Sequence, residues 1–361
     1  MEANIFLGIA LHAVGGIAAA SCFVPQKGTS RWQFQNFWLL MCLAAWLIVP
    51  VIVASLTVPN LWGVIAGTEG KVLLKVTLLG AVYGFGGMAF GVAIRHIGYS
   101  LTYAVAIGIS AVLGTILPLL QTGTLLQTFS VPGGSMIVTA GFMALGGIVL
   151  CGIAGKMKES QLAGSEVHFN AKLGLTLVVL AGVLSAVFGL SLAAGEPMDK
   201  LATAHGAGQF AAGAKYIFAM GGALITNLVW WGVVHTRCGT WKDYKRLDTA
   251  RNTRGGGGLA SHYLFALFAG LLWYGQFFFY GLGHTRMGNY GFISWGVHMA
   301  MLIFFSFIIG LILKEWKGLK SSTLAMLAAG LTVLLTSFAL IVYGSYQGEQ
   351  ASKTEQQAPG H

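Results

Sequence analysis

An uncharged run of twenty residues decides the fold class: Phe37-Trp-Leu-Leu-Met-Cys-Leu-Ala-Ala-Trp-Leu-Ile-Val-Pro-Val-Ile-Val-Ala-Ser-Leu56. In an α-helix each residue rises about 1.5 Å, so a run of this length spans the roughly 30 Å hydrocarbon core of a bilayer. A strand of an outer-membrane barrel would need only about ten residues, and its apolar residues would alternate with polar ones, which they do not do here. The run therefore predicts a transmembrane helix.

Nine more apolar runs of membrane-spanning length lie along the chain. They are residues 5–23, 72–94, 101–120, 135–154, 173–194, 216–234, 259–282, 292–313 and 323–343. Apolar residues make up 56% of the 361 and charged residues only 9%, whereas about a quarter of the residues of a soluble protein are charged. The sequence predicts an all-α membrane protein with about ten transmembrane helices, and excludes a soluble globular domain.

The formal net charge of +10 indicates orientation in the membrane more than affinity for nucleic acid. Most Lys and Arg residues fall in the loops that follow the odd-numbered helices, including six between residues 237 and 254. Because positively charged loops stay on the cytoplasmic side, these loops are expected in the cytoplasm and both termini in the periplasm of a bacterial inner membrane. No nucleic-acid partner is expected, and the oligomeric state stays open.

An internal repeat appears when the chain is shifted by 190 positions. The matched pairs are Gly80 with Gly270, Tyr83 with Trp273, Phe90 with Tyr280, Gly91 with Gly281 and Gly98 with Gly288. The shift moves the chain by five helices, an odd number, so the two halves would have opposite orientations. Inverted repeats of this kind are typical of secondary transporters, which hold the substrate near the membrane midplane. We expect one five-helix repeat in residues 1–160, a second in 161–343, and a polar, disordered tail in 344–361.

The region Trp273–Arg286, with Ile293-Ser-Trp-Gly-Val-His-Met299 and Leu313-Lys-Glu-Trp316, resembles the L-rhamnose/proton symporter family of the drug/metabolite transporter superfamily. The resemblance covers nearly all ten predicted helices. It implies a five-plus-five helix bundle and proton-driven uptake of L-rhamnose or a related deoxy sugar. No cofactor or metal is expected. The chain departs from the family pattern at Asn289-Tyr-Gly-Phe292, where an acidic residue is expected, and at Gly86-Gly-Met-Ala89, where a polar Asn is expected.

Proton coupling has few candidate residues, because all eleven carboxylates lie outside the predicted spans. Ionisable groups within a membrane are energetically unfavourable and therefore indicate function. His12 and His298 lie well inside the first and ninth spans, and a histidine titrates near neutrality, so these two are the predicted proton carriers. The alternative is a pair of neutral imidazoles that only hydrogen-bond between packed helices.

Sugar binding is predicted on one face of the eighth span, where residues follow i, i+3, i+4, i+7 and i+11 spacing. These are Trp273, Gln276, Phe277, Tyr280 and His284. Aromatic rings cover the C–H face of a sugar, and an amide both donates to and accepts from its hydroxyls. Trp295 and Tyr83, the repeat mate of Trp273, are further candidates for substrate binding, whereas Asn227 is expected to join helices.

Two rival functions stay open. A permease or exporter of another small metabolite, coupled to sodium, would have the same helices. A membrane transferase is the rival from another class, but the chain has no HExxH motif and no acidic residue inside a span that would serve such chemistry. The sequence favours a transporter that is not an enzyme.

Overall fold

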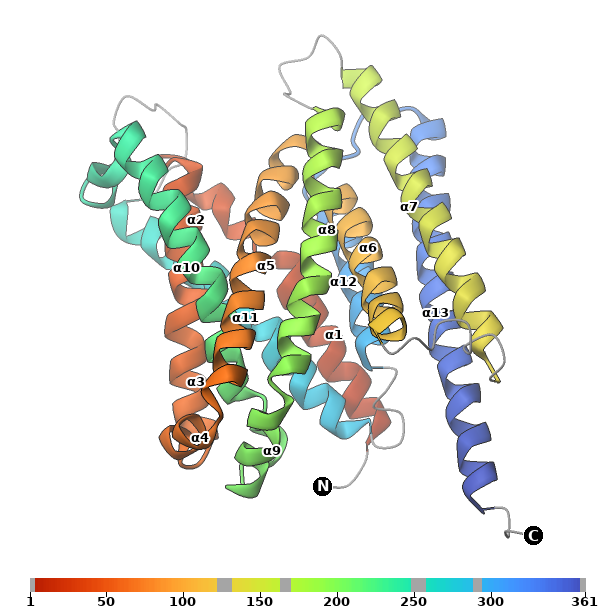
Figure 1. Ribbon diagram of the computed structural model, residues 1–361. Coiled ribbons are helices and arrows are strands. Elements are labelled where there is room, and N and C mark those ends of the chain that lie inside the picture. The colour runs from red at the N-terminus through yellow and green to blue at the C-terminus, as the bar shows by residue number, and fades with distance from the viewer. Residues whose placement is uncertain (1–3, 122–131, 163–169, 248–257, 288–293, 358–361) are drawn as a thin grey trace. The chain divides into compact units, whose positions relative to one another are not determined.

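The computed structural model describes residues 4–121, 132–162, 170–247, 258–287 and 294–357. Within these ranges every regular element is a helix (Figure 1). Nine of the described helices are long and apolar enough to cross a membrane, and a shorter apolar helix covers Tyr99–Leu113. The predicted all-α membrane fold with about ten spans is therefore confirmed.

The helices coincide with the predicted runs. The spans are α1 (Ile5–Ser21), α2 (Phe34–Leu43) continued by η2 (Ala44–Ile48) and α3 (Val49–Thr57), α5 (Gly70–Ile97), α6 (Tyr99–Gln121), α7 (Gly134–Leu162), α8 (Ala171–Ala194), α10 (Gly213–Cys238), α11 (Leu259–Arg286), α12 (Ser294–Ile312) and α13 (Ser321–Gln357). Shorter elements connect them: η1 (Val24–Thr29), α4 (Leu61–Gly67), α9 (Glu196–Ala204), η4 (Gly208–Phe210) and η5 (Thr240–Tyr244).

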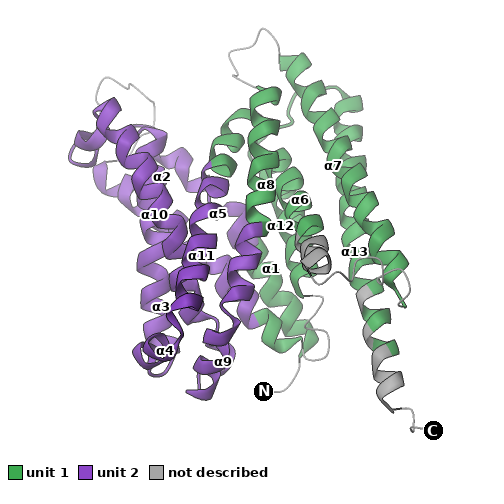
Figure 2. Cartoon of the chain, viewed as in Figure 1, with its two compact units in different colours: residues 1–16, 89–186, 283–361 green, residues 17–88, 187–282 purple. Residues whose placement is uncertain are grey.

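The chain forms two compact units that do not follow its two halves (Figure 2). Unit 1 contains residues 1–16, 89–186 and 283–361, and unit 2 contains residues 17–88 and 187–282. The second and seventh spans both belong to unit 2, whereas the fourth and ninth, and the fifth and tenth, belong to unit 1. Each of these spans thus shares a unit with its repeat mate, which agrees with a repeat but does not test the predicted boundaries at 160 and 343.

In unit 1, α7 and α13 pack closely because small residues line their contact. A methyl group on Gly147 would lie 3.0 Å from the Gly330 carbonyl oxygen, and one on Gly330 would lie 2.8 Å from Cys151 Sγ. Glycine lets helix backbones approach in this way within a membrane. At its other end α13 continues as far as Gln357.

In unit 2, α5 crosses α10 where a methyl group on Gly80 would collide with the Ala219 carbonyl. Gly270 likewise allows a close helix crossing, between α11 and the second span, since a methyl group there would lie 2.7 Å from the Met41 carbonyl oxygen. The repeat pairs Gly80 with Gly270. It also pairs α5, the third span, with α11, the eighth span, and it pairs α10, the seventh span, with the second span. The two crossings are therefore equivalent, which supports the predicted repeat.

Asn227, which is fully buried on α10, joins three helices as expected. Its Oδ1 accepts a hydrogen bond from Trp38 Nε1 of α2 (2.8 Å), and its Nδ2 donates to the Gly84 carbonyl oxygen of α5 (3.1 Å). A third bond, to the Ala223 carbonyl oxygen (2.9 Å), stays within α10. A buried amide with these partners satisfies its polar groups inside the apolar core.

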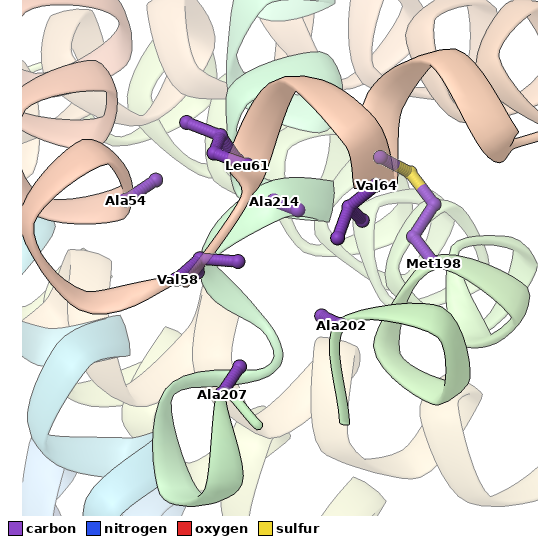
Figure 3. Packing of buried hydrophobic residues seen from close by; sticks show 8 residues of the cluster. All are labelled: Ala54, Val58, Leu61, Val64, Met198, Ala202, Ala207 and Ala214. Atoms are coloured by element: carbon purple, nitrogen blue, oxygen red, sulfur yellow. The ribbon is translucent and has the colours of Figure 1, made fainter. Parts of the chain in front are cut away.

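The short helices α4 and α9 close one end of unit 2 around an apolar cluster (Figure 3). The cluster consists of Ala54, Val58, Leu61, Val64, Met198, Ala202, Ala207 and Ala214. Figure 3 labels Val64 of α4 and Met198 of α9 among the side chains of this cluster. Asp199 of α9 forms an ion pair with Lys215 of α10, which fixes α9 against the start of that span.

Candidate functional site

A pair of buried histidines lies in unit 1. His12 comes from α1 and His298 from α12, and their side chains are 0% and 2% exposed. The two imidazole rings are 5.7 Å apart between centroids and tilted by 58°. α1 and α12 approach closely at Gly16, where a methyl group would lie 2.8 Å from Met301 Cβ. The structure thus joins the two predicted proton carriers, from opposite ends of the sequence, into one site.

The end of α11 forms a third side of the histidine pair. A methyl group on Gly283 would lie 2.9 Å from His12 Cε1, so the ring rests directly on the α11 backbone. His284, the next residue, is exposed and lies within electrostatic range of His12. The pair therefore has a fixed backbone neighbour and a further titratable side chain nearby.

Aromatic side chains form a continuous group in unit 2, which we call the aromatic group: Trp46, Tyr83, Phe188, Tyr216, Trp273, Tyr274 and Phe277. Successive ring centroids lie 6.3 Å apart for Trp46–Tyr83, 5.3 Å for Trp46–Trp273, 4.5 Å for Tyr83–Phe188, 5.4 Å for Phe188–Phe277, 5.2 Å for Trp273–Phe277, 5.9 Å for Tyr216–Phe277 and 6.4 Å for Tyr216–Tyr274. Most of the contacts are edge-on or tilted, as aromatic rings prefer. Three of the predicted sugar-binding residues, namely Tyr83, Trp273 and Phe277, belong to the aromatic group.

The other predicted sugar-binding residues lie in different surroundings. Gln276 is buried beside this group, and its Nε2 donates to the Trp273 carbonyl oxygen at 3.0 Å. Tyr280 is half-buried and lies within electrostatic range of Tyr216. Trp295 is half-buried on α12 in unit 1, one turn from His298. The region Asn289–Phe292, where the chain departs from the family pattern, lies outside the described residues.

Sequence reasoning missed Trp46, Phe188, Tyr216 and Tyr274. Each lies in an apolar run with no polar partner in the sequence to distinguish it from an ordinary core residue. Tyr216 and Phe277 also line a small pocket between α3, α10 and α11. The one available signal was the repeat, because it placed Tyr83 opposite Trp273 and so indicated that aromatic residues gather from both halves.

The Leu313–Trp316 motif that carried part of the resemblance connects three helices of unit 1. Glu315 accepts hydrogen bonds from the backbone N–H groups of Tyr99 (2.7 Å) and Ser100 (3.3 Å), at the start of α6. A carboxylate at a helix N-terminus satisfies free N–H groups and interacts favourably with the helix dipole. Trp316 donates to Ser100 Oγ (3.2 Å), and the buried Lys158 of α7 lies 4.4 Å above the Trp316 ring. The motif therefore fixes the α12–α13 connection to α6 and α7.

A tyrosine-centred network holds the start of the basic α10–α11 loop in unit 2. The Tyr244 hydroxyl donates to the Asn36 carbonyl oxygen (3.2 Å) and lies 3.2 Å from His235 Nε2. Tyr263 of α11 donates to the Tyr244 carbonyl oxygen (2.8 Å). Burial raises the pKa of the Tyr244 phenol, so it stays a neutral donor. The network gives η5 a fixed position against α2 and α11.

Among the described residues, no group of three His, Cys, Asp or Glu side chains could hold a metal ion. About ten apolar helices, a buried imidazole pair and an aromatic group define a multi-pass membrane protein of the transporter class. The family model described as L-rhamnose-proton symport protein matches residues 1–346. The chain belongs to this family.

Relatives support the assignment over almost the whole length. The L-rhamnose-proton symporter of Yersinia pestis (strain Pestoides F) is 33% identical over 349 residues, which cover 95% of this chain and 99% of the relative. The L-rhamnose-proton symporter of Cronobacter sakazakii (strain ATCC BAA-894) matches with the same identity and coverage. The protein is thus a proton-coupled sugar transporter and not an enzyme, and the membrane-transferase alternative is excluded.

Proposed function

We propose that this protein takes up L-rhamnose, or a closely related deoxy sugar, together with protons across a bacterial inner membrane. The family and the names of the relatives support the substrate class. The distribution of Lys and Arg supports an orientation with both termini in the periplasm. Sodium coupling and export have no supporting observation.

The His12–His298 pair is the proposed proton carrier, and it is the observation that carries the mechanism. Its two rings are buried together within the spans and lie 5.7 Å apart. No carboxylate lies within a predicted span, and histidine is the side chain whose unperturbed pKa lies nearest neutrality, which supports this buried imidazole pair as the proton carrier. A proton from the acidic periplasm would bind to the pair and leave it on the cytoplasmic side.

The aromatic group is the proposed sugar-contacting surface. Trp273 and Phe277 present flat apolar faces that can cover the C–H groups and the methyl group of a 6-deoxy sugar. The Gln276 amide keeps a carbonyl oxygen and a second N–H beyond its bond to Trp273, so it can both donate to and accept from sugar hydroxyls. Tyr280 and Trp295 stay candidates on the strength of the sequence pattern.

Alternating access is proposed to use the inverted repeat. The equivalent glycine crossings at Gly80 and Gly270, and the pairing of repeat-related spans within each unit, support two five-helix halves. In secondary transporters of this plan, the halves or bundles move around a central site. The predicted boundaries of the halves stay part of the proposal.

The experiment is transport by the purified protein in liposomes with an imposed pH gradient, against a panel of radiolabelled deoxy sugars. We expect L-rhamnose to accumulate when the outside is acidic, with no dependence on sodium. Accumulation driven by a sodium gradient at equal pH would contradict proton coupling. Counterflow of a different metabolite, with none of L-rhamnose, would contradict the substrate.

A further inference from the structure

The second span contains a single wide turn, the π-helix η2 between α2 and α3. The Val49 N–H bonds to the Ala44 carbonyl oxygen, five residues earlier, instead of four. Pro50 explains the turn: it has no N–H, and its ring would clash with the carbonyl four residues earlier, that of Trp46. Wide turns of this kind are rare and occur often at functional sites.

The wide turn holds Trp46 in the centre of the aromatic group. The side chain is 1% exposed, and its ring meets Trp273 (5.3 Å) and Tyr83 (6.3 Å) edge-on. Gly87 of α5 provides the space, since a methyl group there would lie 3.3 Å from Trp46 Cη2. The position of the Trp46 ring is therefore fixed by a proline on its own span and by a glycine opposite.

The indole N–H of Trp46 differs from those of three other buried tryptophans. Trp32, Trp38 and Trp316 each donate to an oxygen, at 3.0, 2.8 and 3.2 Å. Trp46 Nε1 has no hydrogen-bond partner among the described residues, although it is enclosed by the core. Leaving a buried donor without an acceptor is unfavourable, so such a group in a binding region indicates an acceptor supplied by a ligand.

We propose that Trp46 is a specificity-determining residue, whose indole N–H donates a hydrogen bond to an oxygen of the transported sugar. This inference rests on the proposed function and assigns one contact within it. The indole N–H can only donate, so it recognises a hydroxyl or ring oxygen through a lone pair. The neighbouring faces of Tyr83 and Trp273 then contact the apolar part of the same sugar.

The test compares L-rhamnose binding by the wild-type protein and Trp46→Phe, purified in nanodiscs and titrated calorimetrically. Phenylalanine keeps an aromatic ring but removes the N–H, so we expect about a tenfold weaker Kd, as for one lost hydrogen bond. Trp231→Phe is the matched control, because Trp231 Nε1 is also buried without a partner, packs against Phe34 and lies outside the aromatic group. The control should bind within twofold of wild type.

A second variant separates the N–H from the fit of the ring. Replacement of Trp46 by 3-benzothienylalanine exchanges the N–H for sulfur at nearly unchanged shape, and it should show the same loss. Monodeoxy derivatives of L-rhamnose identify the accepting oxygen. The derivative that lacks this oxygen should bind to wild type about tenfold more weakly than L-rhamnose does. To each Trp46 variant, the same derivative and L-rhamnose should bind with equal affinity.

The outcomes distinguish the inference from the proposed function. If wild type and Trp231→Phe bind L-rhamnose while both Trp46 variants bind it equally well, the inference is wrong and the function stands. If wild type binds no L-rhamnose or other deoxy sugar, the proposed function fails, and the inference fails with it.

Discussion

One proton per sugar is the transport stoichiometry expected from the geometry of His12 and His298. With centroids 5.7 Å apart, two positive charges repel each other by about 3 kcal/mol at an effective dielectric constant of about 20. That energy disfavours the doubly protonated pair roughly 100-fold relative to independent sites. The buried pair should therefore bind a single proton in each transport cycle.

The assay measures the steady accumulation of L-rhamnose in proteoliposomes, with the membrane potential held at zero by potassium and valinomycin. For one proton per sugar, an inward gradient of one pH unit supplies about 1.4 kcal/mol and supports at most about tenfold accumulation. Two protons would support about 100-fold. Accumulation clearly above tenfold would refute the argument that repulsion limits the pair to one charge.

His298→Gln tests the same reasoning from the other side. Glutamine preserves polarity but binds no proton, so accumulation should fall to a ratio of about one while exchange of internal for external sugar continues. His205→Gln is the control, because His205 is exposed after α9 and should leave accumulation unchanged. Retained accumulation by His298→Gln would exclude this residue from proton coupling and leave the alternative of a purely structural imidazole.

Three further substitutions test other parts of the structure. Glu315→Gln removes the charge that binds the first N–H groups of α6, and we expect about 1–2 kcal/mol lower stability in mixed-micelle unfolding; an unchanged midpoint would contradict this. Gly283→Ala places a methyl group 2.9 Å from His12 Cε1 of the proposed proton carrier and should impair accumulation more than counterflow. Gly275→Ala is the control, because the nearest atom to its methyl group would be 3.8 Å away, and it should leave both intact. Asn227→Ala removes two hydrogen bonds between helices and should lower the free energy of unfolding by about 1–3 kcal/mol. A double-mutant cycle with Trp38→Phe should give a coupling energy of about 1 kcal/mol. Zero coupling would show that the Trp38–Asn227 hydrogen bond does not stabilise the protein.

The helices could be predicted from sequence because a membrane imposes a local rule. Each span must satisfy its own backbone hydrogen bonds and expose apolar side chains to lipid. Runs such as 37–56 and 173–194 can therefore be recognised from their length and apolar composition. The short helices α4 and α9 follow no such rule. They form because Val64, Met198 and their neighbours bury one another, which depends on contacts between distant parts of the chain.

The candidate site was only partly predictable for the same reason. His12 and His298 stood out individually, because an ionisable side chain in an apolar run is rare, but nothing local indicated that their rings would meet. Trp46 could not be identified as a site residue from the sequence, because a tryptophan in an apolar run has the same local pattern whether or not its indole N–H forms a hydrogen bond. Pro50 was visible in the same run, but a proline alone does not show which side chain the resulting turn positions.

α11 contributes residues to the surroundings of both proposed sites. Phe277 belongs to the aromatic group of unit 2, whereas Gly283, further along the same continuous helix, packs against the His12 ring in unit 1. In the proposed mechanism the proton carrier and the sugar-contacting surface are separate groups of residues, so proton coupling would not require a carboxylate that binds sugar and proton at one point, which agrees with a chain that places every acidic residue outside its predicted spans.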